Sequence, residues 1–455
     1  MTEPMLDFAV SPPANETLPE RVKLCVLGGG AAGISIARHL RGRGCDEIAV
    51  LEKEPRVGGK CHSVLIDGRP HDLGAVLGLP GDCDELLALS KSLGLETCWM
   101  PPQQRVFLRD GLARRPLASK TCDPRLWFEA VKYLFLHRFT WGCVSAAALH
   151  RVPRELCAPW QQVAERRRLR RFSAASLHAR TGFGYGFDES TPALYMINNL
   201  RSRNVINSVR CNFVLWKSGM QAIWSAAAQT VPVWTGVRVK RIVRKNEVVL
   251  DLETAQGEQT LRAERLVIAC NPKNLLNELD ADSEERLLYQ QIRNVDYRSY
   301  ALRVADWETG VASTGYFSEN MCSSEIGRPL GWMKRYPDQD VGVFYAFGAA
   351  DISDSDVLEK IQADLSRLGG SISEVCNSKQ WDYFPHVGSA ALERGFYEKL
   401  ASRQGERRTY LTGELLSFSS LPRVLQNAGV VAARVAEDLK RTQRAFSMRY
   451  PPQEL

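Results

Sequence analysis

A short stretch of charged residues and glycines, "LEKEPRVGGK", carries side chains suited to binding a dinucleotide. Glu52 stands at the end of the predicted strand "EIAVLEK", 24 residues after Gly28. A carboxylate there accepts hydrogen bonds from both hydroxyls of an adenosine ribose and repels a 2′-phosphate, which disfavours NADP. Arg56 can neutralise a pyrophosphate, and the bare amides of Gly58 and Gly59 let the chain pass close to it. For Arg56 alone, the alternative is a solvated arginine on a loop.

The elements that must position these side chains lie just upstream, in "KLCVLGGGAAGISIARHL". The pattern predicts an apolar strand, Leu24 to Leu27, then a glycine turn, then a helix that starts near Ala31. Gly28, Gly30 and Gly33 give the spacing G-x-G-x-x-G, which suits a tight turn, close approach of a pyrophosphate and packing of helix on strand. The helix N-terminus then faces the phosphates with unpaired N–H groups.

The run E-x-x-x-R-x-G-G-K, followed by "DGRPHDLGA" (67–75), resembles the FAD-binding signature of the flavin amine oxidase and phytoene desaturase superfamily. Two later segments resemble the rest of that site. Residues 231–272 alternate as a small antiparallel sheet that returns the chain to the nucleotide domain, and residues 408–439 read as strand, Gly-Glu, loop and long helix. The resemblance implies FAD contacts at Gly28, Gly30, Ala32, Gly33, Glu52, Lys53, Arg56, Gly59, Lys60, Val239, Gly413 and Glu414.

The implied fold class is α/β: a Rossmann-type FAD-binding domain assembled from three segments, with an interleaved mixed α+β substrate domain that has a helical part, as in amine oxidases. We predict that residues 1–20 form a flexible N-terminal arm. The FAD-binding domain is expected to comprise residues 21–80, 215–275 and 400–445, and the substrate domain residues 81–214 and 276–399.

Four blocks resemble a narrower group, the bacterial FAD-dependent polyenoic fatty acid double-bond isomerases. They are "VGGKCHS" (57–63), "GAVLGLP" (74–80), "FGYGFDESTPALYM" (183–196) and the spaced motifs "WDYFPHV", "GFYEKL" and "GERRTYLTGELLSF" within 381–418. This resemblance implies that a hydride passes to flavin N5 and back, which moves double bonds in a hydrophobic unsaturated substrate. Cys61 is not placed like the cysteine that carries covalent FAD in some amine oxidases, so we expect non-covalent FAD.

The same group suggests where the substrate would bind. In those isomerases an arginine shortly before a "FLxxDG" segment pairs with the fatty acid carboxylate, and "QQRVFLRDG" offers Arg105 one residue closer to the Asp-Gly. The alternative is a surface arginine at the start of a hairpin. The group's aromatic gate residue falls near Ser208-Val209, so it is missing or moved here. Aromatic lining is expected from Phe183, Tyr185, Trp381, Tyr383 and Phe384.

Acid–base chemistry has weaker support. The chain has seven histidines, at 39, 62, 71, 137, 150, 178 and 386, and none lies in a nucleophile elbow or a metal motif. His62 and His386 are equally well read as structural hydrogen-bonders or as an acid or base. Two alternatives to the isomerase stay open: a net FAD-dependent oxidase, dehydrogenase or desaturase of a hydrophobic or amine substrate, and a non-catalytic flavoprotein.

Composition limits the remaining possibilities. The 12 cysteines include no C-x-x-C pair, which favours a reduced, cytoplasmic protein without a metal. The N-terminus does not read as a signal peptide, and no window approaches the ~18 apolar residues of a membrane span. The net charge of +7 comes without a nucleic-acid-binding motif. The oligomeric state is not predicted.

Two segments leave a partner open. The run "ERRRLRR" (165–171) is expected to be a solvated helix face, or otherwise a contact with an acidic partner or an anionic membrane surface. The segment "DPRLWFEAVKYLFLHRFTWGC" (123–143) predicts a helix with a broad apolar surface. Core packing is the ordinary explanation; an entrance for a lipid-like substrate or a peripheral membrane contact is the alternative.

Overall fold

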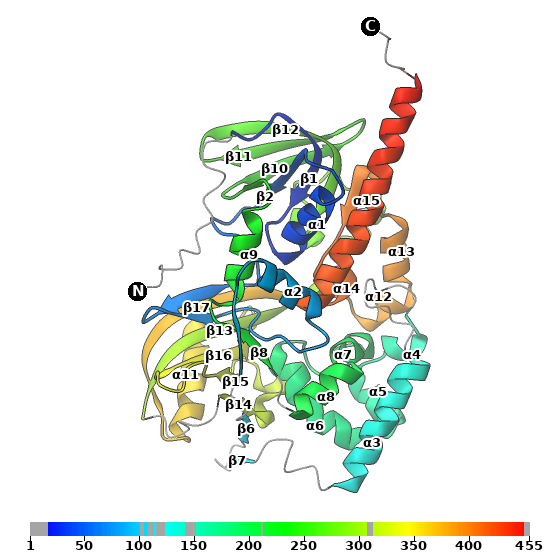
Figure 1. Cartoon of the computed structure of the whole chain (residues 1–455). Coiled ribbons are helices and arrows are strands. Elements are labelled where there is room, and N and C mark those ends of the chain that lie inside the picture. The colour runs from blue at the N-terminus through cyan, green and yellow to red at the C-terminus, as the bar shows by residue number, and fades with distance from the viewer. Residues whose placement is uncertain are drawn as a thin grey trace.

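Two large sheets and a group of helices make up the molecule (Figure 1). The computed structural model describes residues 17–449, except 101–103, 108–112, 115–122, 142–148, 150–151, 211–212 and 307–312. Most of the expected N-terminal arm therefore lies outside the described residues. Among the described residues, none of the helices combines the length and hydropathy that crossing a membrane requires.

The first sheet has seven strands in the order β10-β11-β12-β1-β2-β9, and β18 pairs with β12. Strand β1 runs parallel to both β2 and β12, so the glycine turn after β1 opens at the carboxyl edge of the sheet. The strands come from three distant parts of the chain, as predicted: β1 Arg21–Leu27, β2 Ile48–Leu51, β9 Val233–Trp234, β10 Arg238–Arg244, β11 Val248–Thr254, β12 Gly257–Ile268 and β18 Thr409–Leu411.

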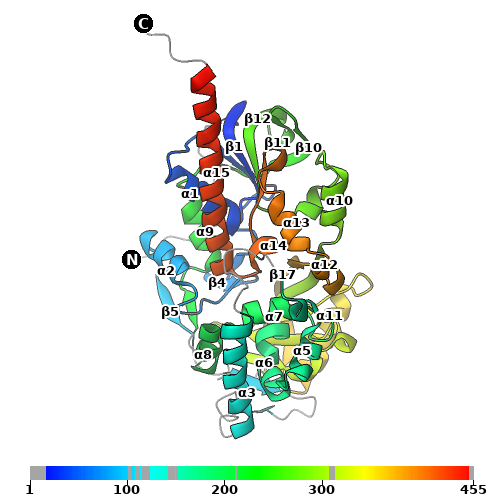
Figure 2. The same ribbon diagram turned by 90° about the vertical axis from the view of Figure 1, so that its right-hand side faces the viewer.

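Alternate residues of β1 face opposite layers, which explains why the strand is apolar on both sides. Leu24 and Val26 pack under three helices: α1 (Ala31–Arg41), α9 (Met220–Ala228) and α15 (Leu421–Arg449). Cys25 and Leu27 pack into a second cluster on the other face of the sheet. Figure 2 shows α15 lying along α1 and continuing beyond the sheet toward the C-terminus.

The second sheet also has seven strands, in the order β17-β13-β16-β15-β14-β6-β7. Tyr300 and Leu302 of β13 pack against helix α11 (Asp354–Ser366), whereas Tyr297 and Ala301 belong to the cluster on the opposite face. The strands are β6 Gln104–Phe107, β7 Ala113–Arg114, β13 Arg293–Ala305, β14 Thr314–Phe317, β15 Pro329–Met333, β16 Val341–Phe347 and β17 Ser371–His386.

The helical part lies beside the second sheet (Figure 1). Its helices are α3 Pro124–Phe135, α4 Arg154–Cys157, α5 Trp160–Arg166, α6 Arg170–Arg180, α7 Ala193–Asn199 and α8 Ser202–Arg210. The helix predicted over 123–143 is shorter in the structure: α3 ends at Phe135, and a π-helical turn, Leu136–Thr140, follows it. The arginine run is not one helix face, because it spans the turn from α5 to α6, where Arg168 has a φ of +50°.

The remaining elements connect these units. Two small antiparallel sheets have two strands each: β3 (Ser63–Ile66) pairs with β4 (Arg69–Asp72), and β5 (Thr97–Trp99) pairs with β8 (Val214–Trp216). The other helices are α2 Asp84–Ser92, α10 Ser283–Gln290, α12 Ser389–Glu393, α13 Phe396–Ser402 and α14 Glu414–Ser417. The predicted fold class, with a dinucleotide sheet built from three segments and an interleaved substrate domain, is confirmed; the exact domain boundaries stay predictions.

A buried ion pair ties the two units together. Arg335, just after β15, places Nη1 2.7 Å from a carboxylate oxygen of Asp72 on β4, and both side chains are almost fully buried. The other oxygen of Asp72 accepts from the Ser63 hydroxyl at 2.5 Å and from the Met220 N–H at 2.9 Å. The second guanidinium nitrogen of Arg335 donates to the Trp216 carbonyl. The groups that hydrogen-bond to Asp72 and Arg335 thus come from several other elements of the fold.

Candidate active site

The glycine turn after β1 forms a bare surface at the N-terminus of α1. Gly28 has a φ of +106°, and a Cβ on Gly33 would lie 1.8 Å from the Gly28 carbonyl oxygen. The helix therefore packs so closely on the turn that no side chain fits at position 33. Gly30 precedes α1 without a side-chain cap, and the first turn carries no acidic residue. The open N–H groups there suit a pyrophosphate.

Glu52 is buried beside this turn, with 7% of its surface exposed. Its Oε2 accepts from the Gly29 N–H at 2.7 Å and its Oε1 from the Glu54 N–H at 2.9 Å. Burial raises the pKa of Glu52, and these two N–H groups act against that shift. Each oxygen keeps further lone pairs, so the fixed carboxylate can still accept from ribose hydroxyls.

The loop after Glu52 folds back over the glycine turn. Gly58 donates its N–H to the Gly29 carbonyl at 2.9 Å, and Gly58 and Gly59 have φ values of +101° and +56°. Arg56 donates to the Val57 and Gly59 carbonyls, at 3.3 and 3.1 Å. Because a guanidinium has five N–H donors, Arg56 keeps donors for a phosphate while its own loop holds it in place.

Lys60 and Glu414 meet in space although 354 residues separate them. Lys60 Nζ lies 2.8 Å from Glu414 Oε2, which also accepts from the Ser419 hydroxyl at 3.0 Å. The ammonium group lies 5.6 Å from the centre of the Tyr383 ring. Behind Glu414, Gly413 has a φ of +104° and donates its N–H to Asn427 Oδ1 at 3.1 Å. The pair marks the passage from the dinucleotide sheet to the second sheet.

Beyond this pair, aromatic rings line the site. The centroid of Tyr185 lies 4.7 Å from that of Phe418 and 6.0 Å from that of Tyr383. Tyr297 of β13 lies 5.2 Å from Tyr383 and stacks on Tyr345 of β16 at 5.8 Å. Burial raises the pKa of the four tyrosines well above the ordinary value, so their hydroxyls stay protonated. This end of the site is apolar and uncharged at these rings.

One continuous cavity of about 950 Å³ joins the glycine turn to the aromatic rings. Its wall includes most of the residues that the sequence predicts for the site: Gly28, Gly30, Ala32, Glu52, Lys53, Arg56, Gly59, Lys60, Val239, Glu414, Phe183, Tyr185 and Trp381. Trp381 is fixed because its Nε1 donates to the Leu73 carbonyl and the Ser299 hydroxyl, both at 3.1 Å. The residues present fit FAD: an anchored carboxylate, a bare turn and an arginine lie in the order that the dinucleotide needs.

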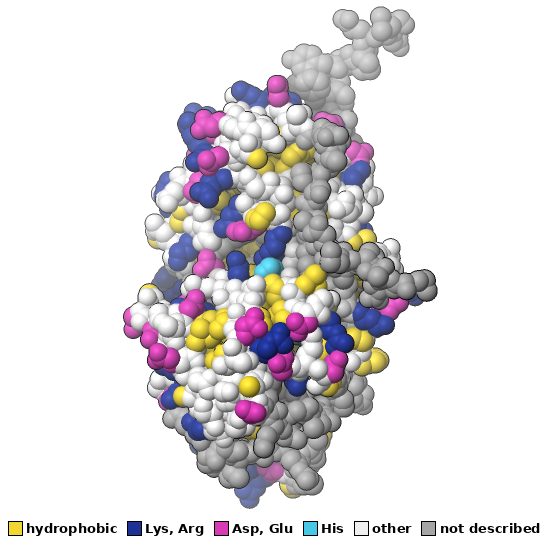
Figure 3. Space-filling model, turned by 90° about the vertical axis from the view of Figure 1, so that its left-hand side faces the viewer, with side chains coloured by type: hydrophobic (Ala, Val, Ile, Leu, Met, Phe, Trp, Pro, Cys, Tyr) yellow, Lys and Arg dark blue, Asp and Glu magenta, His cyan; other side chains and the backbone are white. Residues whose placement is uncertain are grey.

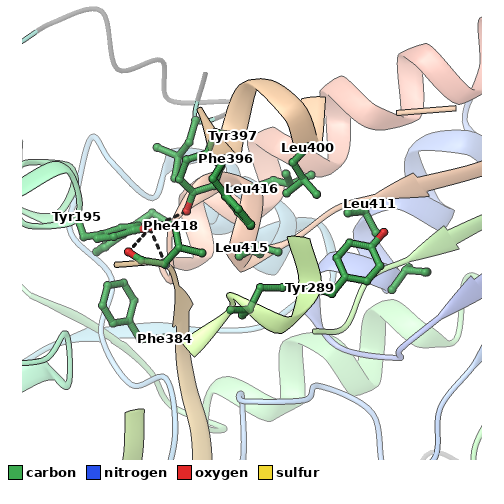
Figure 4. Packing of buried hydrophobic residues seen from close by; sticks show 14 of the residues in the cluster. Tyr195, Tyr289, Phe384, Phe396, Tyr397, Leu400, Leu411, Leu415, Leu416 and Phe418 are labelled. Atoms are coloured by element: carbon green, nitrogen blue, oxygen red, sulfur yellow. Dashed lines mark hydrogen bonds between the residues drawn. The ribbon is translucent and has the colours of Figure 1, made fainter. Parts of the chain in front are cut away.

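Three predicted residues, Gly33, Phe384 and Gly413, are not part of the wall that the described residues form. Gly33 and Gly413 pack behind it, as described above. Phe384 is buried against Tyr195 and Phe418 (Figure 4), and its φ of +49° departs from an extended strand, whereas the neighbouring Tyr383 and Pro385 line the cavity. Arg105 lies on β6 in register with Gly315 of β14, and its side chain is outside the described part of the structure, as are those of Ser208 and Val209.

Three tyrosines of the wall were missed from the sequence: Tyr297, Tyr316 and Tyr345. They come from β13, β14 and β16, three strands of the second sheet. The signal that the sequence offered for them was strand alternation: in "YRSYALRV", Tyr297 and Ser299 lie on the same face of the second sheet as Tyr345. Sequence alternation shows that such residues share a face but not which face borders a cavity.

The two histidines that the sequence singled out make hydrogen bonds outside the cavity wall. His62 Nδ1 lies 3.2 Å from Gln221 Oε1, and His386 Nδ1 lies 2.8 Å from the Phe384 carbonyl oxygen, to which it donates. Burial lowers the pKa of both imidazoles to about 4, so they are neutral near pH 7. Neither belongs to the cavity wall.

Comparison with known proteins agrees with this geometry. The family model described as flavin containing amine oxidoreductase matches residues 31–436. An FAD-dependent oxidoreductase, dpchF, of Colletotrichum higginsianum is 22% identical over 465 residues, which covers 92% of this chain and 94% of that protein. An uncharacterized protein, R656, of Acanthamoeba polyphaga mimivirus is 24% identical over 447 residues, covering 87% and 90% of the two chains.

Solved structures share the fold. A CLA-producing fatty acid isomerase from P. acnes aligns with a TM-score of 0.84 and 23% identity, over 92% of this chain and 99% of the other. Putrescine oxidase with bound putrescine aligns with a TM-score of 0.69 and 18% identity, over 92% and 99% of the two chains. At these identities the likeness establishes the fold, and the cofactor follows from the family.

Proposed function

Because this chain belongs to the flavin containing amine oxidoreductase family and is an FAD-dependent enzyme, we propose that it moves double bonds within a hydrophobic unsaturated substrate, such as a fatty-acid-like molecule, without net oxidation. The main support is the cavity, whose aromatic end continues directly from the dinucleotide cradle. Bound FAD supplies a centre that accepts a hydride and can return it.

The protein's own residues would bind and orient such a substrate and keep water out. Tyr297, Tyr345 and Tyr383 form a stacked wall whose rings are held by one another, so a flat polyene would meet a preformed surface. A dry, aromatic site also favours a delocalised positive charge in the substrate over its capture by water. Since His62 and His386 lie outside the cavity wall, the proposed reaction uses neither imidazole.

A net oxidase acting on an amine is the second candidate, because putrescine oxidase shares the fold. An amine substrate is an ammonium ion in water, and either a carboxylate or aromatic faces can bind it. Two carboxylates of the wall pair with cations, Glu414 with Lys60 and Asp82 with Arg423 at 2.7 Å, whereas Asp382 lines the cavity between Trp381 and Tyr383. Since the wall offers both aromatic faces and a carboxylate, an amine stays the second candidate.

The product's mass separates the two candidates. After aerobic incubation of the purified protein with candidate polyenes, we expect mass spectrometry to find products of unchanged mass and shifted ultraviolet absorption. A loss of two hydrogens would identify a dehydrogenase, and turnover of amines but not of polyenes would favour the oxidase.

Arg105 is proposed as the anchor of a substrate carboxylate. Strand β6 pairs with β14 beside the cavity: Thr314 and Tyr316, which line the wall, are in register with Gln104 and Val106, and Arg105 lies between these two positions, in register with Gly315. Replacing Arg105 by Ala is expected to raise KM for a free acid about ten- to hundredfold, the worth of a charged hydrogen bond at roughly 1.5–3 kcal/mol. FAD content should not change. The exposed loop residue Arg168 gives a control, Arg168→Ala, and equal kinetics for R105A and parent would make Arg105 a surface residue.

A further inference from the structure

The outer face of α3 and its π-helical turn exposes an unusual set of large apolar side chains. We define the α3 face as Trp127, Phe128, Val131, Phe135 and Phe139, whose exposed fractions are 47%, 71%, 63%, 60% and 69%. Eleven large hydrophobic side chains of the described residues are exposed, and five of them lie on this segment. Contiguous exposed apolar surface of this kind marks a binding face.

The spacing makes the α3 face one continuous stripe. Phe128, Val131, Phe135 and Phe139 follow one another at steps of three and four residues, which keeps them on one side of a helix. The rings of Phe135 and Phe139 lie 4.8 Å apart, so the π-helical turn continues the stripe.

The opposite side of α3 is firmly packed, so the exposure does not come from a loose helix. Tyr133 is fully buried, stacks on Phe172 at 4.3 Å and donates its hydroxyl to the Leu200 carbonyl at 2.7 Å. Asp123 caps the helix by accepting from the Arg125 N–H at 3.0 Å. Leu200 itself lines the cavity, which places α3 one layer away from the cavity wall.

Basic side chains flank the α3 face. Arg125 and Arg138 are exposed on the segment, and Arg166, Arg168 and Arg170 are exposed on the turn beside it. That turn is held against α3, since Arg171 pairs with Asp123 at 2.6 Å and the Phe172 N–H donates to Glu129 at 3.0 Å.

The nearby acids do not cancel these charges. Asp123 is used by Arg171, and Glu155 is used by Arg167 at 2.6 Å. Glu129 is half-buried under the Phe172 amide, and Glu165 is the remaining exposed acid of this turn. Elsewhere, on the face seen in Figure 3, basic and acidic side chains are interspersed.

We propose that the α3 face docks this protein onto the surface of an anionic lipid bilayer. Aromatic rings on one side of a helix with arginines at its margins suit the interface, where the rings enter the acyl boundary and the guanidinium groups meet phosphates. Figures 1 and 2 show α3 on the outside of the helical part, away from the dinucleotide sheet. The proposal stands on this surface alone and does not depend on the proposed reaction.

Vesicle sedimentation of the FAD-loaded protein tests the proposal without substrate. Vesicles of phosphatidylcholine and phosphatidylglycerol, two to one, should pellet the protein, whereas pure phosphatidylcholine should pellet much less, and added salt should weaken binding. The double variant F128S/F135S should lose binding by about tenfold or more, because two rings no longer enter the interface. The control L287S/V430S alters side chains that are similarly exposed, at 63% and 52%, on α10 and α15, and should bind like the parent.

Retained FAD in each variant shows that it is folded. Failure of the parent to pellet, or equal pelleting of parent and F128S/F135S, overturns the proposal. Light scattering tests the other possible occupant of the α3 face, a second copy of the chain. If the parent does not pellet and its particle mass is halved in F128S/F135S, the face joins two copies of the chain.

Discussion

A variant in which Ala replaces Glu52 is expected to purify nearly colourless, without most of its FAD. The carboxylate is buried, and its two oxygens are positioned by the N–H groups of Gly29 and Glu54. Its removal leaves those donors and the ribose hydroxyls without their acceptor. With each hydrogen bond to a charged group worth roughly 1.5–3 kcal/mol, FAD affinity should fall about a hundredfold or more.

The absorbance ratio of flavin to protein and the Kd of added FAD measure this effect. Glu54→Ala is the matched control, because the side chain of Glu54 is 49% exposed and only its backbone N–H serves Glu52. Glu52→Gln should bind FAD with intermediate affinity, since it keeps the shape and loses the charge. Acid precipitation of the parent should release free FAD, as expected for a non-covalent cofactor. A yellow Glu52→Ala protein with unchanged Kd would refute the assigned role.

The second large effect concerns stability. Replacing Asp72 by Ala leaves the buried guanidinium of Arg335 without its counter-charge, along with the Ser63 hydroxyl and the Met220 N–H. Breaking a buried pair in this way costs about 3–5 kcal/mol. Because Asp72 and Arg335 come from different units of the fold, the loss should lower the free energy of unfolding of the whole FAD-loaded protein, as measured by denaturant titration.

An exposed pair of the same chemistry provides the control. Arg69 and Asp338 also approach to 2.7 Å, but their side chains are 44% and 63% exposed. Replacing Asp338 by Ala should destabilise the protein far less than D72A does, because water screens the exposed pair. Similar losses in D72A and D338A would show that the buried pair does not hold the two units together.

The local part of the cofactor site could be predicted from the sequence. The spacing of Gly28 and Gly33 specifies a tight turn between strand and helix, and the structure contains that turn. Glu52 was expected at the end of a strand beside the turn, where the structure places it. The same holds for the strands β10, β11 and β12, whose alternation and turns are local signals.

The rest depends on tertiary contacts that no local pattern carries. Lys60 meets Glu414 across 354 residues, and only the assembled sheets bring them together. Tyr297 and Tyr345 stack because β13 and β16 are neighbours, which alternation alone does not specify. Phe384 was predicted as a substrate contact from its aromatic ring, but its backbone turns out of the extended conformation there, with a φ of +49°, and its neighbour Tyr383 lines the cavity.

The proposed reaction shifts double bonds without consuming an electron acceptor, and the fate of a deuterium label distinguishes it from net oxidation. A polyene deuterated at the reacting methylene is incubated aerobically with the purified protein, and mass spectrometry locates the label while a peroxidase assay follows hydrogen peroxide. We predict that the product keeps the deuterium, at a different carbon, and that no peroxide forms. Peroxide in step with turnover would contradict this proposal and identify a net oxidase, and loss of the label to solvent without peroxide would contradict it in favour of proton transfer.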